Sequence, residues 1–192
     1  MNVLLFDDLF LTICDYFDMK QIIKLELISK YHCILIRKTT WFKDMFIKNN
    51  DIFDHMIKYY QCKNLSISSI VKVNDYIDYL KKCHTLYLGG TDVTNETAKE
   101  LKNCYELDLM STKVTDDGVK YLHNCNILNL WGTSITNDSI KNLNCHVLNV
   151  SWTRVTDEGV KNLKCKVLYI KGTKVTDACI QKLRSNGCTV YN

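Results

Sequence analysis

Apolar and polar residues alternate in short segments that recur along the C-terminal two thirds of the chain. Each segment has the pattern Cys-x-x-apolar-x-apolar, as in CHTLYL, CYELDL, CNILNL, CHVLNV and CKVLYI. The two apolar residues lie two positions apart, which is the period of a β-strand with one buried face. The cysteines follow one another at intervals of 21, 21, 21, 20 and 20 residues, at positions 62, 83, 104, 125, 145 and 165. We therefore predict one short strand in every copy of a repeat of 20 or 21 residues.

A short helix is predicted after each strand. In the five clear copies a threonine follows three residues after the apolar pair, and a second threonine, between Val or Ile and Asp or Asn, comes three residues later. The second threonine suits a helix N-cap, and the Asp or Asn after it suits the positive end of the helix dipole. The residue before the cap and the fourth residue after it form a hydrophobic staple, such as Val114 with Val119. We expect helices to begin at Thr94, Thr115, Thr136, Thr156 and Thr176.

A unit of strand, turn, short helix and turn with this length resembles the leucine-rich repeat, with Cys in the first conserved apolar slot. The resemblance covers residues 62–192, or about six coils, and implies an α/β solenoid with parallel strands on the concave face and short helices on the convex face. A physical argument agrees. Burying about six side chains gains roughly 1.5–3 kcal/mol each, whereas ordering about 20 residues costs roughly 1–2 kcal/mol each. One coil alone does not fold, so neighbouring coils must stack.

The repeated cysteine is predicted to be a packing residue. A free cysteine behaves as a small apolar side chain, and a stack of identical side chains suits the core of a solenoid. Two alternatives are disulfides and a metal site, for which His123, Cys125, Cys145 and His146 are the nearest candidates. The Cys-x-x-Cys spacing of zinc sites is absent, and adjacent residues such as Cys145 and His146 point to opposite faces of a strand. We expect no metal site and no cofactor.

Side chains between and beside the apolar pair should point away from the core and form a protein-binding surface on the concave face. Trp131 and Trp152 would stand close together near Met110, and exposed Trp, Tyr and Met are frequent in interface hot spots. The alternative is that both Trp rings only cover the turns between strand and helix. The candidate target-binding residues are Tyr87, Asp108, Met110, Asn129, Trp131, Asn149, Trp152, Tyr169 and Lys171.

Residues 1–48 follow a helical pattern instead of the repeat, with Leu9, Ile13 and Phe17 on one face and a possible capping box from Asp18 to Gln21. The order LLFDDLFLTICDYFDMKQIIKLELISKYHCILIRKTTWFKDMF resembles the F-box, a domain of three short helices. The matching elements are an opening apolar pair, an acidic pair, an Ile-Ser-Lys and a closing aromatic pair: Leu5-Phe6, Asp7-Asp8, Ile28-Ser29-Lys30 and Trp41-Phe42. Phe6 replaces the usual proline, and His32 replaces the usual tryptophan. We expect residues 49–61 to form a connecting helix.

An F-box followed by leucine-rich repeats is similar to the substrate adaptors of cullin-RING (SCF-type) ubiquitin ligases. The resemblance implies that the F-box binds a Skp-family linker, and through it the cullin and its RING partner, while the repeats hold a protein target. An alternative is a stand-alone interaction module or decoy that recruits no ligase. The residues that would contact the linker are Leu5, Phe6, Leu9, Ile13, Ile22, Leu25 and Ile28.

Composition and charge argue against several other classes of function. The net charge of +4 comes from 25 basic and 21 acidic residues that are interspersed along the chain, so no basic arm for nucleic acid is present. The apolar N-terminus lacks a basic start and carries three aspartates, which argues against a signal peptide and favours a soluble cytoplasmic protein. No phosphate loop, catalytic triad or paired catalytic carboxylates emerges, so we expect no enzyme. The absence of proline and the scarcity of Ala and Arg suggest an AT-rich genome, such as that of a protist or a large DNA virus, with the host cytoplasm as location in the viral case.

Overall fold

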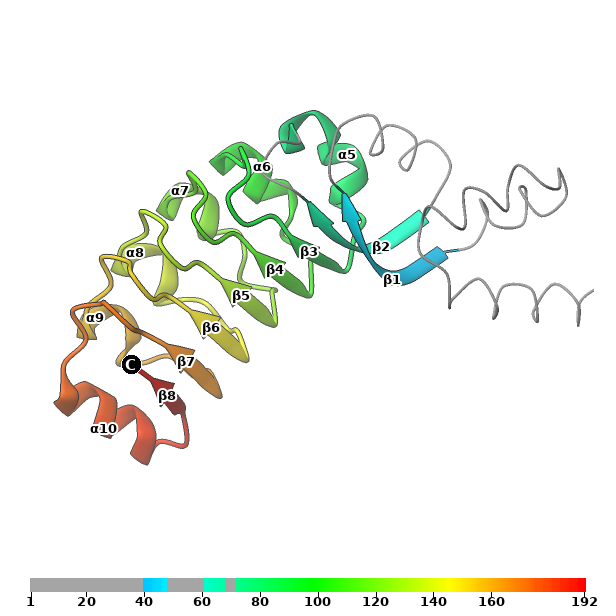
Figure 1. Ribbon diagram of the computed structural model, residues 1–192. Helices are drawn as coiled ribbons and strands as arrows, with labels where there is room; N and C mark the ends of the chain where they lie inside the picture. Colours follow the sequence, from blue (N-terminus) through cyan, green and yellow to red (C-terminus); the bar gives the residue numbers. More distant parts are fainter. Residues whose placement is uncertain (1–39, 48–60, 68–71) are drawn as a thin grey trace, which may run out of the picture.

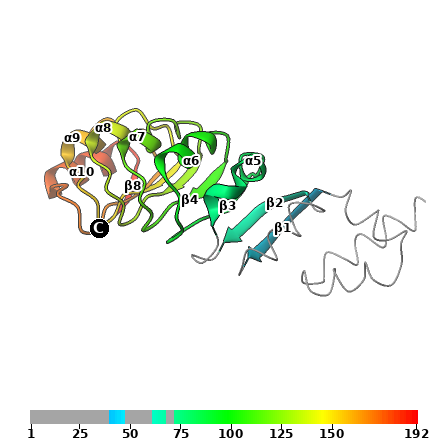
Figure 2. The same cartoon turned by 90° about the horizontal axis from the view of Figure 1, so that it is seen from above.

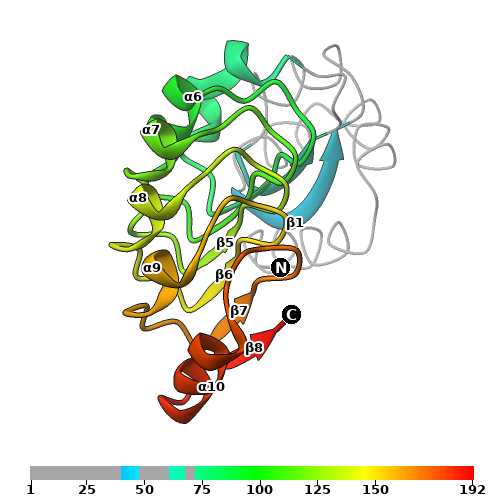
Figure 3. The same cartoon turned by 90° about the vertical axis from the view of Figure 1, so that its left-hand side faces the viewer.

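The computed structural model describes residues 40–47, 61–67 and 72–192 (Figure 1). Eight strands in these ranges form one parallel sheet in which each strand pairs with its neighbour in the chain. In the views of Figures 1 and 3, the strands follow one another along a curved arc. The strands are β1 (Thr40–Ile47), β2 (Gln61–Ile67), β3 (Thr85–Tyr87), β4 (Glu106–Asp108), β5 (Ile127–Asn129), β6 (Val147–Asn149), β7 (Val167–Tyr169) and β8 (Thr189–Tyr191).

Short helices follow the strands from β2 to β7 and form a second layer. Figure 2 shows helices α6 to α10 along one side of the solenoid and the strands along the other. None of the helices in the described ranges has the length and hydropathy needed to cross a membrane. The helices are η1 (Val73–Tyr76), α5 (Ile77–Leu80), α6 (Asn95–Glu100), α7 (Asp116–Val119), α8 (Asn137–Ile140), α9 (Asp157–Val160) and α10 (Asp177–Ser185).

The core lies between the two layers and repeats with the sequence. The central residues of the strands are in register from coil to coil, so that Leu107 pairs with Leu128 and Leu128 with Leu148. These leucines are at most 1% exposed, and the staple residues of the helices, such as Val114 and Val119, are fully buried beside them. Because every coil covers the apolar residues of the next, the stack supplies the burial that one coil lacks. The structure confirms the predicted solenoid with parallel strands and short helices.

The threonine predicted as N-cap stands at that position in all five helices from α6 to α10. The side chains of Thr94, Thr136 and Thr176 accept a hydrogen bond from a backbone N–H of the first turn. Thr115 and Thr156 make no such bond, because their hydroxyl oxygens instead accept a bond from the preceding coil. The residues after the caps therefore act between coils as well as at the helix dipole.

These residues form a turn ladder, which consists of Asn95, Asp116, Asn137 and Asp157. Each accepts a hydrogen bond from the backbone N–H of the cap threonine one coil later, over 2.7–2.9 Å. Each also contacts that threonine's hydroxyl, over 2.6–3.0 Å. The donor and acceptor lie 19 or 20 residues apart in the chain. The turn ladder thus fixes the spacing of successive coils at the start of each helix.

The N-terminal side of the sheet differs from the prediction. We assigned residues 1–48 to a helical domain, but residues 40–47 form β1, which pairs with β2. The segment TWFKDMFI contains several aromatic and β-branched residues that favour strands, and the neighbouring edge of β2 supplies the partner for its backbone. Residues 1–39, which contain all seven candidate linker contacts, lie outside the described residues. The same is true of the predicted connecting helix except Gln61, which begins β2.

Candidate functional site

The concave face is formed by the strand residues whose side chains point away from the helices. These residues make two columns, one on each side of the buried leucine of every strand. The inner column, which precedes the leucine, contains Glu106, Ile127, Val147 and Val167. The outer column, which follows it, contains Tyr87, Asp108, Asn129, Asn149, Tyr169 and Tyr191.

A shallow hollow of about 240 Å³ lies on this face between β3 and β7. Tyr87 and Tyr169 stand at its two ends, and the acidic residues Glu106 and Asp108 lie next to Tyr87. Ile127 and Val147 are half-buried and contribute apolar surface to its lining. Beyond Tyr169, the ring of Tyr191 stacks on it with ring centroids 4.8 Å apart, so the aromatic end of the surface continues to the last strand.

Hydrogen bonds hold the polar side chains of the hollow in place. The hydroxyl of Tyr87 donates to Oε1 of Glu106 over 2.9 Å. Oδ1 of Asp108 accepts from the backbone N–H of Met110 over 2.8 Å, and Asn129 makes the same bond to the N–H of Trp131. Because both acceptors bind the N–H two residues later, they shape the turn that ends each strand.

Asp108 has an unusual environment for a carboxylate. Burial raises its pKa, the bonds from Met110 and Asn129 oppose that rise, and the nearby charge of Glu106 adds to it. The five ion pairs found among the described residues all lie on the helices or at their ends, between residues three positions apart. Glu106 and Asp108 belong to none of them, so the hollow carries negative charge without an ion-pair partner from the described chain.

The predicted concave residues occupy distinct positions. Tyr87, Asp108, Asn129, Asn149 and Tyr169 form the outer column as expected, and all five line the hollow. Met110, Trp131 and Lys171 come two residues further along the chain, where the strand ends, and Met110 and Lys171 are exposed while Trp131 is half-buried. The neighbouring position in the fifth coil, Ser151, is buried.

Trp152 lies in the turn rather than on the strand. Its φ of +57° is in the left-handed region, where the other coils have Gly90, Gly132, Gly172 or Ser111. A Cβ added at Gly172 would stand 2.8 Å from the indole, so the ring covers the turn of the next coil, as one of our two readings expected. The indole nevertheless leaves the residue 57% exposed. A bulky residue in this conformation costs free energy, and such strain is concentrated at functional positions.

Sequence analysis missed the inner column of the concave face. Glu106, Ile127 and Val147 stand directly before the leucine that recurs in every strand from β3 to β7, whereas we had predicted contacts only after that leucine. The period-2 rule contained the signal, since a residue on each side of a buried strand position faces the opposite way. Tyr191 was also missed, because the segment that forms β8 departs from the spacing of the repeat.

The cysteines are buried, as the packing interpretation expected. Those at positions 83, 104, 125, 145, 165 and 188 are at most 7% exposed, and all are free thiols. Burial raises the pKa of Cys125, Cys145 and Cys165 to about 12, so these thiols stay protonated and are poor nucleophiles.

His123 and His146 are exposed on the surface while Cys125 and Cys145 are buried, so the four candidate ligands do not converge. Within the described ranges, no three His, Cys, Asp or Glu side chains gather as a metal site would require.

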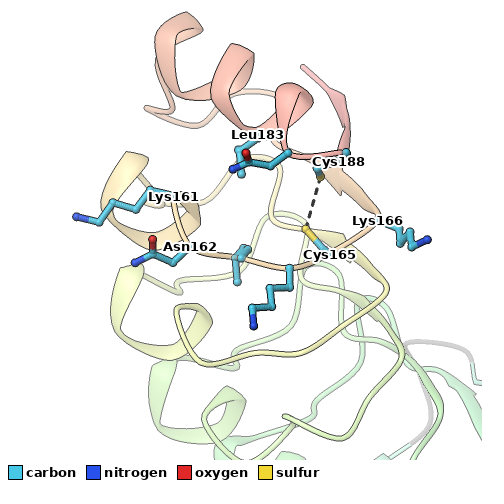
Figure 4. A pocket seen from close by; sticks show the side chains of 10 residues that line it. Lys161, Asn162, Cys165, Lys166, Leu183 and Cys188 are labelled. Atoms are coloured by element: carbon cyan, nitrogen blue, oxygen red, sulfur yellow. Dashed lines mark hydrogen bonds between the residues drawn. The ribbon is translucent and has the colours of Figure 1, made fainter.

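A second hollow, of about 460 Å³, lies between the last two coils (Figure 4). Cys165 and Cys188 meet there, with sulfur atoms 3.8 Å apart. Figure 4 shows Lys161 and Lys166 extending away from the sulfurs in opposite directions. These two lysines therefore do not point at the thiols. Burial raises the pKa of Cys165 to about 12 and raises that of Cys188 as well, so neither thiol is activated as a nucleophile.

A family model and the fold of one solved structure agree with the geometry. A family model described as a leucine-rich repeat matches residues 106–122 and 141–164. An internalin from Listeria monocytogenes has a similar structure, with a TM-score of 0.55 and 12% identity over 85% of this chain and 50% of its own. A leucine-rich repeat protein from Leptospira interrogans reaches a TM-score of 0.47 at 14% identity, over 83% of this chain and 50% of its own. No curated protein matches the chain at a significant level.

The chain thus spans about half the length of the two bacterial proteins. At this level of identity, the likeness to the internalin concerns the fold alone. Repeat period, strand register and the partial family match agree, and the described part of the chain is a parallel-strand solenoid with the fold seen in leucine-rich repeat proteins.

Proposed function

We propose that this chain is a protein-binding adaptor without catalytic activity, and that its concave face holds a segment of a protein target. The observation that carries this proposal is the hollow between β3 and β7, which combines aromatic, amide, carboxylate and apolar side chains on one exposed sheet. Tyr169, Tyr191 and Trp152 add large exposed side chains beside it. Aromatic side chains of this kind supply most of the free energy of binding in many protein interfaces.

The more specific proposal is a substrate adaptor of a cullin-RING ubiquitin ligase in the cytoplasm. It rests on the F-box-like order of residues 1–48, which would bind a Skp-family linker. Such an adaptor raises the effective concentration of the target near the ligase and needs no reactive group of its own. The protonated, buried thiols of the repeated cysteines are consistent with this role.

A stand-alone binding module is the second candidate, and one observation favours it. The closing pair of the F-box-like pattern, Trp41-Phe42, lies in β1 and continues the sheet. The three helices of an F-box would therefore have to end before Thr40. If residues 1–39 instead extend the solenoid, the repeats bind their target without a ligase.

Co-expression of the full chain with a Skp-family linker, followed by size-exclusion chromatography, separates the two candidates. We expect the wild type to co-elute with the linker. Leu9→Asp with Ile13→Asp should abolish the complex, because charges would enter an apolar interface. Trp131→Ala with Trp152→Ala is the matched control, which should keep the linker and lose the target. If folded wild type elutes alone, the ligase role is wrong and the stand-alone module remains.

A further inference from the structure

We propose that the hollow between β3 and β7 takes the side chain of a single lysine or arginine from the bound segment. This inference rests on the proposed function, since it specifies the chemistry of the target that the concave face would hold. Four features carry it: the charge of the hollow, its apolar and aromatic lining, the unused acceptor capacity of its carboxylates, and the charges around it.

The first feature is the charge of the hollow. Glu106 and Asp108 are two residues apart on β4 and therefore face the same side of the sheet. Of the ten residues that line the hollow, these two are acidic and the other eight are neutral. On the helix side of the described solenoid, Asp117, Asp138 and Glu158 each pair with a lysine. The concave carboxylates have no such partner, so a cation from another molecule would neutralise charge that the chain leaves in place.

The second feature is the lining. Ile127 lies on β5, which pairs with the strand of the carboxylates, and Val147 lies on β6, one strand further along. Both offer apolar surface to the methylene groups of a long side chain. Lysine and arginine bury such stems while their charged groups stay near polar partners. Tyr87 and Tyr169 present aromatic rings at the two ends of the hollow, and an ammonium or guanidinium group is attracted to such a ring. An acidic partner side chain would be repelled by Glu106 and Asp108.

The third feature is the acceptor capacity of the carboxylates. Oε1 of Glu106 accepts a bond from Tyr87, and Oδ1 of Asp108 accepts one from the N–H of Met110. These bonds orient the two groups, which lowers the entropy lost when a ligand binds. An ionised carboxylate accepts about four hydrogen bonds, so each group retains sites for a charged donor. A planar guanidinium can engage two such oxygens at once.

The fourth feature is the set of charges around the hollow, which limits the ligand to one cation. Lys171 is exposed two residues after Tyr169, where β7 has ended, and Lys166 is exposed directly before β7. The whole chain carries a net charge of +4. A strongly basic segment would be repelled by these groups outside the hollow. The expected ligand is therefore a segment with one Lys or Arg between neutral or apolar residues.

Selection of random peptides displayed on phage, with the immobilised full chain as bait, tests the inference. We expect the selected peptides to share one Lys or Arg, and replacing it with a neutral residue should abolish binding. The double variant Glu106→Gln with Asp108→Asn should lose affinity about tenfold or more, because it removes a charge-assisted contact. Both changes keep an acceptor for Tyr87 and Met110, and Asn is the natural residue at the position of Asp108 in the next two coils.

The matched control is Asp117→Asn with Glu158→Gln, which removes two carboxylates from the helix side of the solenoid. It should leave peptide affinity unchanged, so that a loss in the concave variant cannot come from total charge. Tyr169→Ala distinguishes failure of the cation inference from failure of the proposed binding to the concave face. If peptides lack Lys and Arg, tolerate the carboxylate variant and still lose binding with Tyr169→Ala, the cation inference is wrong and concave binding stands. If no peptide is enriched, or none responds to any concave variant, both are wrong.

Discussion

Acidic residues on the two sides of the solenoid have opposite environments. Asp116 and Asp157 of the turn ladder have lowered pKa values. For Asp116, burial acts in the other direction, but bonds from Ser139 and Thr136 together outweigh it, and for Asp157 the bonds from Thr176 dominate. Asp108 on the concave face has a raised pKa, because burial and the charge of Glu106 exceed the effect of its hydrogen bonds. The fold therefore stabilises the charge of the first two residues and destabilises the charge of the third.

This difference separates residues that hold the coils together from residues available to a partner. The turn ladder satisfies its own acceptors with donors from the next coil, and Asn and Asp alternate there without loss of the contact. The outer column of the concave face reads Tyr, Asp, Asn, Asn, Tyr and Tyr at equivalent strand positions. Its Asp108, like Glu106 of the inner column, belongs to none of the five ion pairs found among the described residues. Uniform chemistry thus marks the structural side, and varied chemistry marks the binding side.

The largest effect is expected from Asp116→Ala in the turn ladder. It removes the acceptor for the backbone N–H and hydroxyl of Thr136 and for the hydroxyl of Ser139. Three lost hydrogen bonds should lower the free energy of unfolding by about 2 kcal/mol. Urea denaturation at neutral pH measures this change as a lower midpoint.

Asp138→Ala is the control for that experiment. Asp138 stands next to the ladder position and is exposed, and within the described part of the chain its side chain bonds only to Lys141. Its loss should change the free energy of unfolding by less than about 0.5 kcal/mol. Equal effects of the two substitutions would show that the ladder contributes nothing beyond surface charge.

A smaller effect, on binding rather than stability, is expected from Trp152→Gly. Glycine adopts the φ of +57° without strain, and three other coils already have glycine at this position. Stability should therefore change by less than about 1 kcal/mol, since strain relief offsets the lost contact with Gly172. Affinity for a concave-face peptide should fall about tenfold if the exposed indole contacts it. Thermal melts and fluorescence titration measure the two quantities, and a large loss of stability with unchanged affinity would make Trp152 a purely structural residue.

The smallest effect is expected from Asp108→Asn, and its sign depends on pH. Because the folded pKa of Asp108 is raised, its contribution to stability is fully present below the unfolded pKa and is lost as pH rises through the folded pKa. At pH 7 the substitution should therefore raise the melting temperature by about 1–2 °C, and near pH 3 the gain should vanish. Asp116 has the opposite sign, since its stabilisation is lost as pH falls through its lowered folded pKa. Melting curves across this pH range test both, and a destabilised Asp108→Asn at pH 7 would contradict the assignment.

The sequence by itself determined the repeat. Alternating apolar residues, the cap threonine and the staple depend on neighbours within one coil, so their spacing predicted the strands and the helix starts, from Thr94 to Thr176, that the structure contains. It also predicted the outer column, because the side-chain period of a strand is local. These features need no knowledge of how the coils stack.

Only the tertiary structure decided which hydrogen bonds and side-chain contacts join residues about 20 positions apart in the chain. The bond from Thr136 to Asp116 and the placement of Ile127 beside Glu106 exist only after two coils have stacked in register. The left-handed conformation of Trp152 could not be read from its residue type, which disfavours it, because the turns of the neighbouring coils impose it. The joining of β1 to the sheet likewise needed the edge of β2, because the strand-favouring residues of β1 do not supply their own pairing partner. Local periodicity therefore fixes the elements, and the stacking of coils fixes which side chains meet.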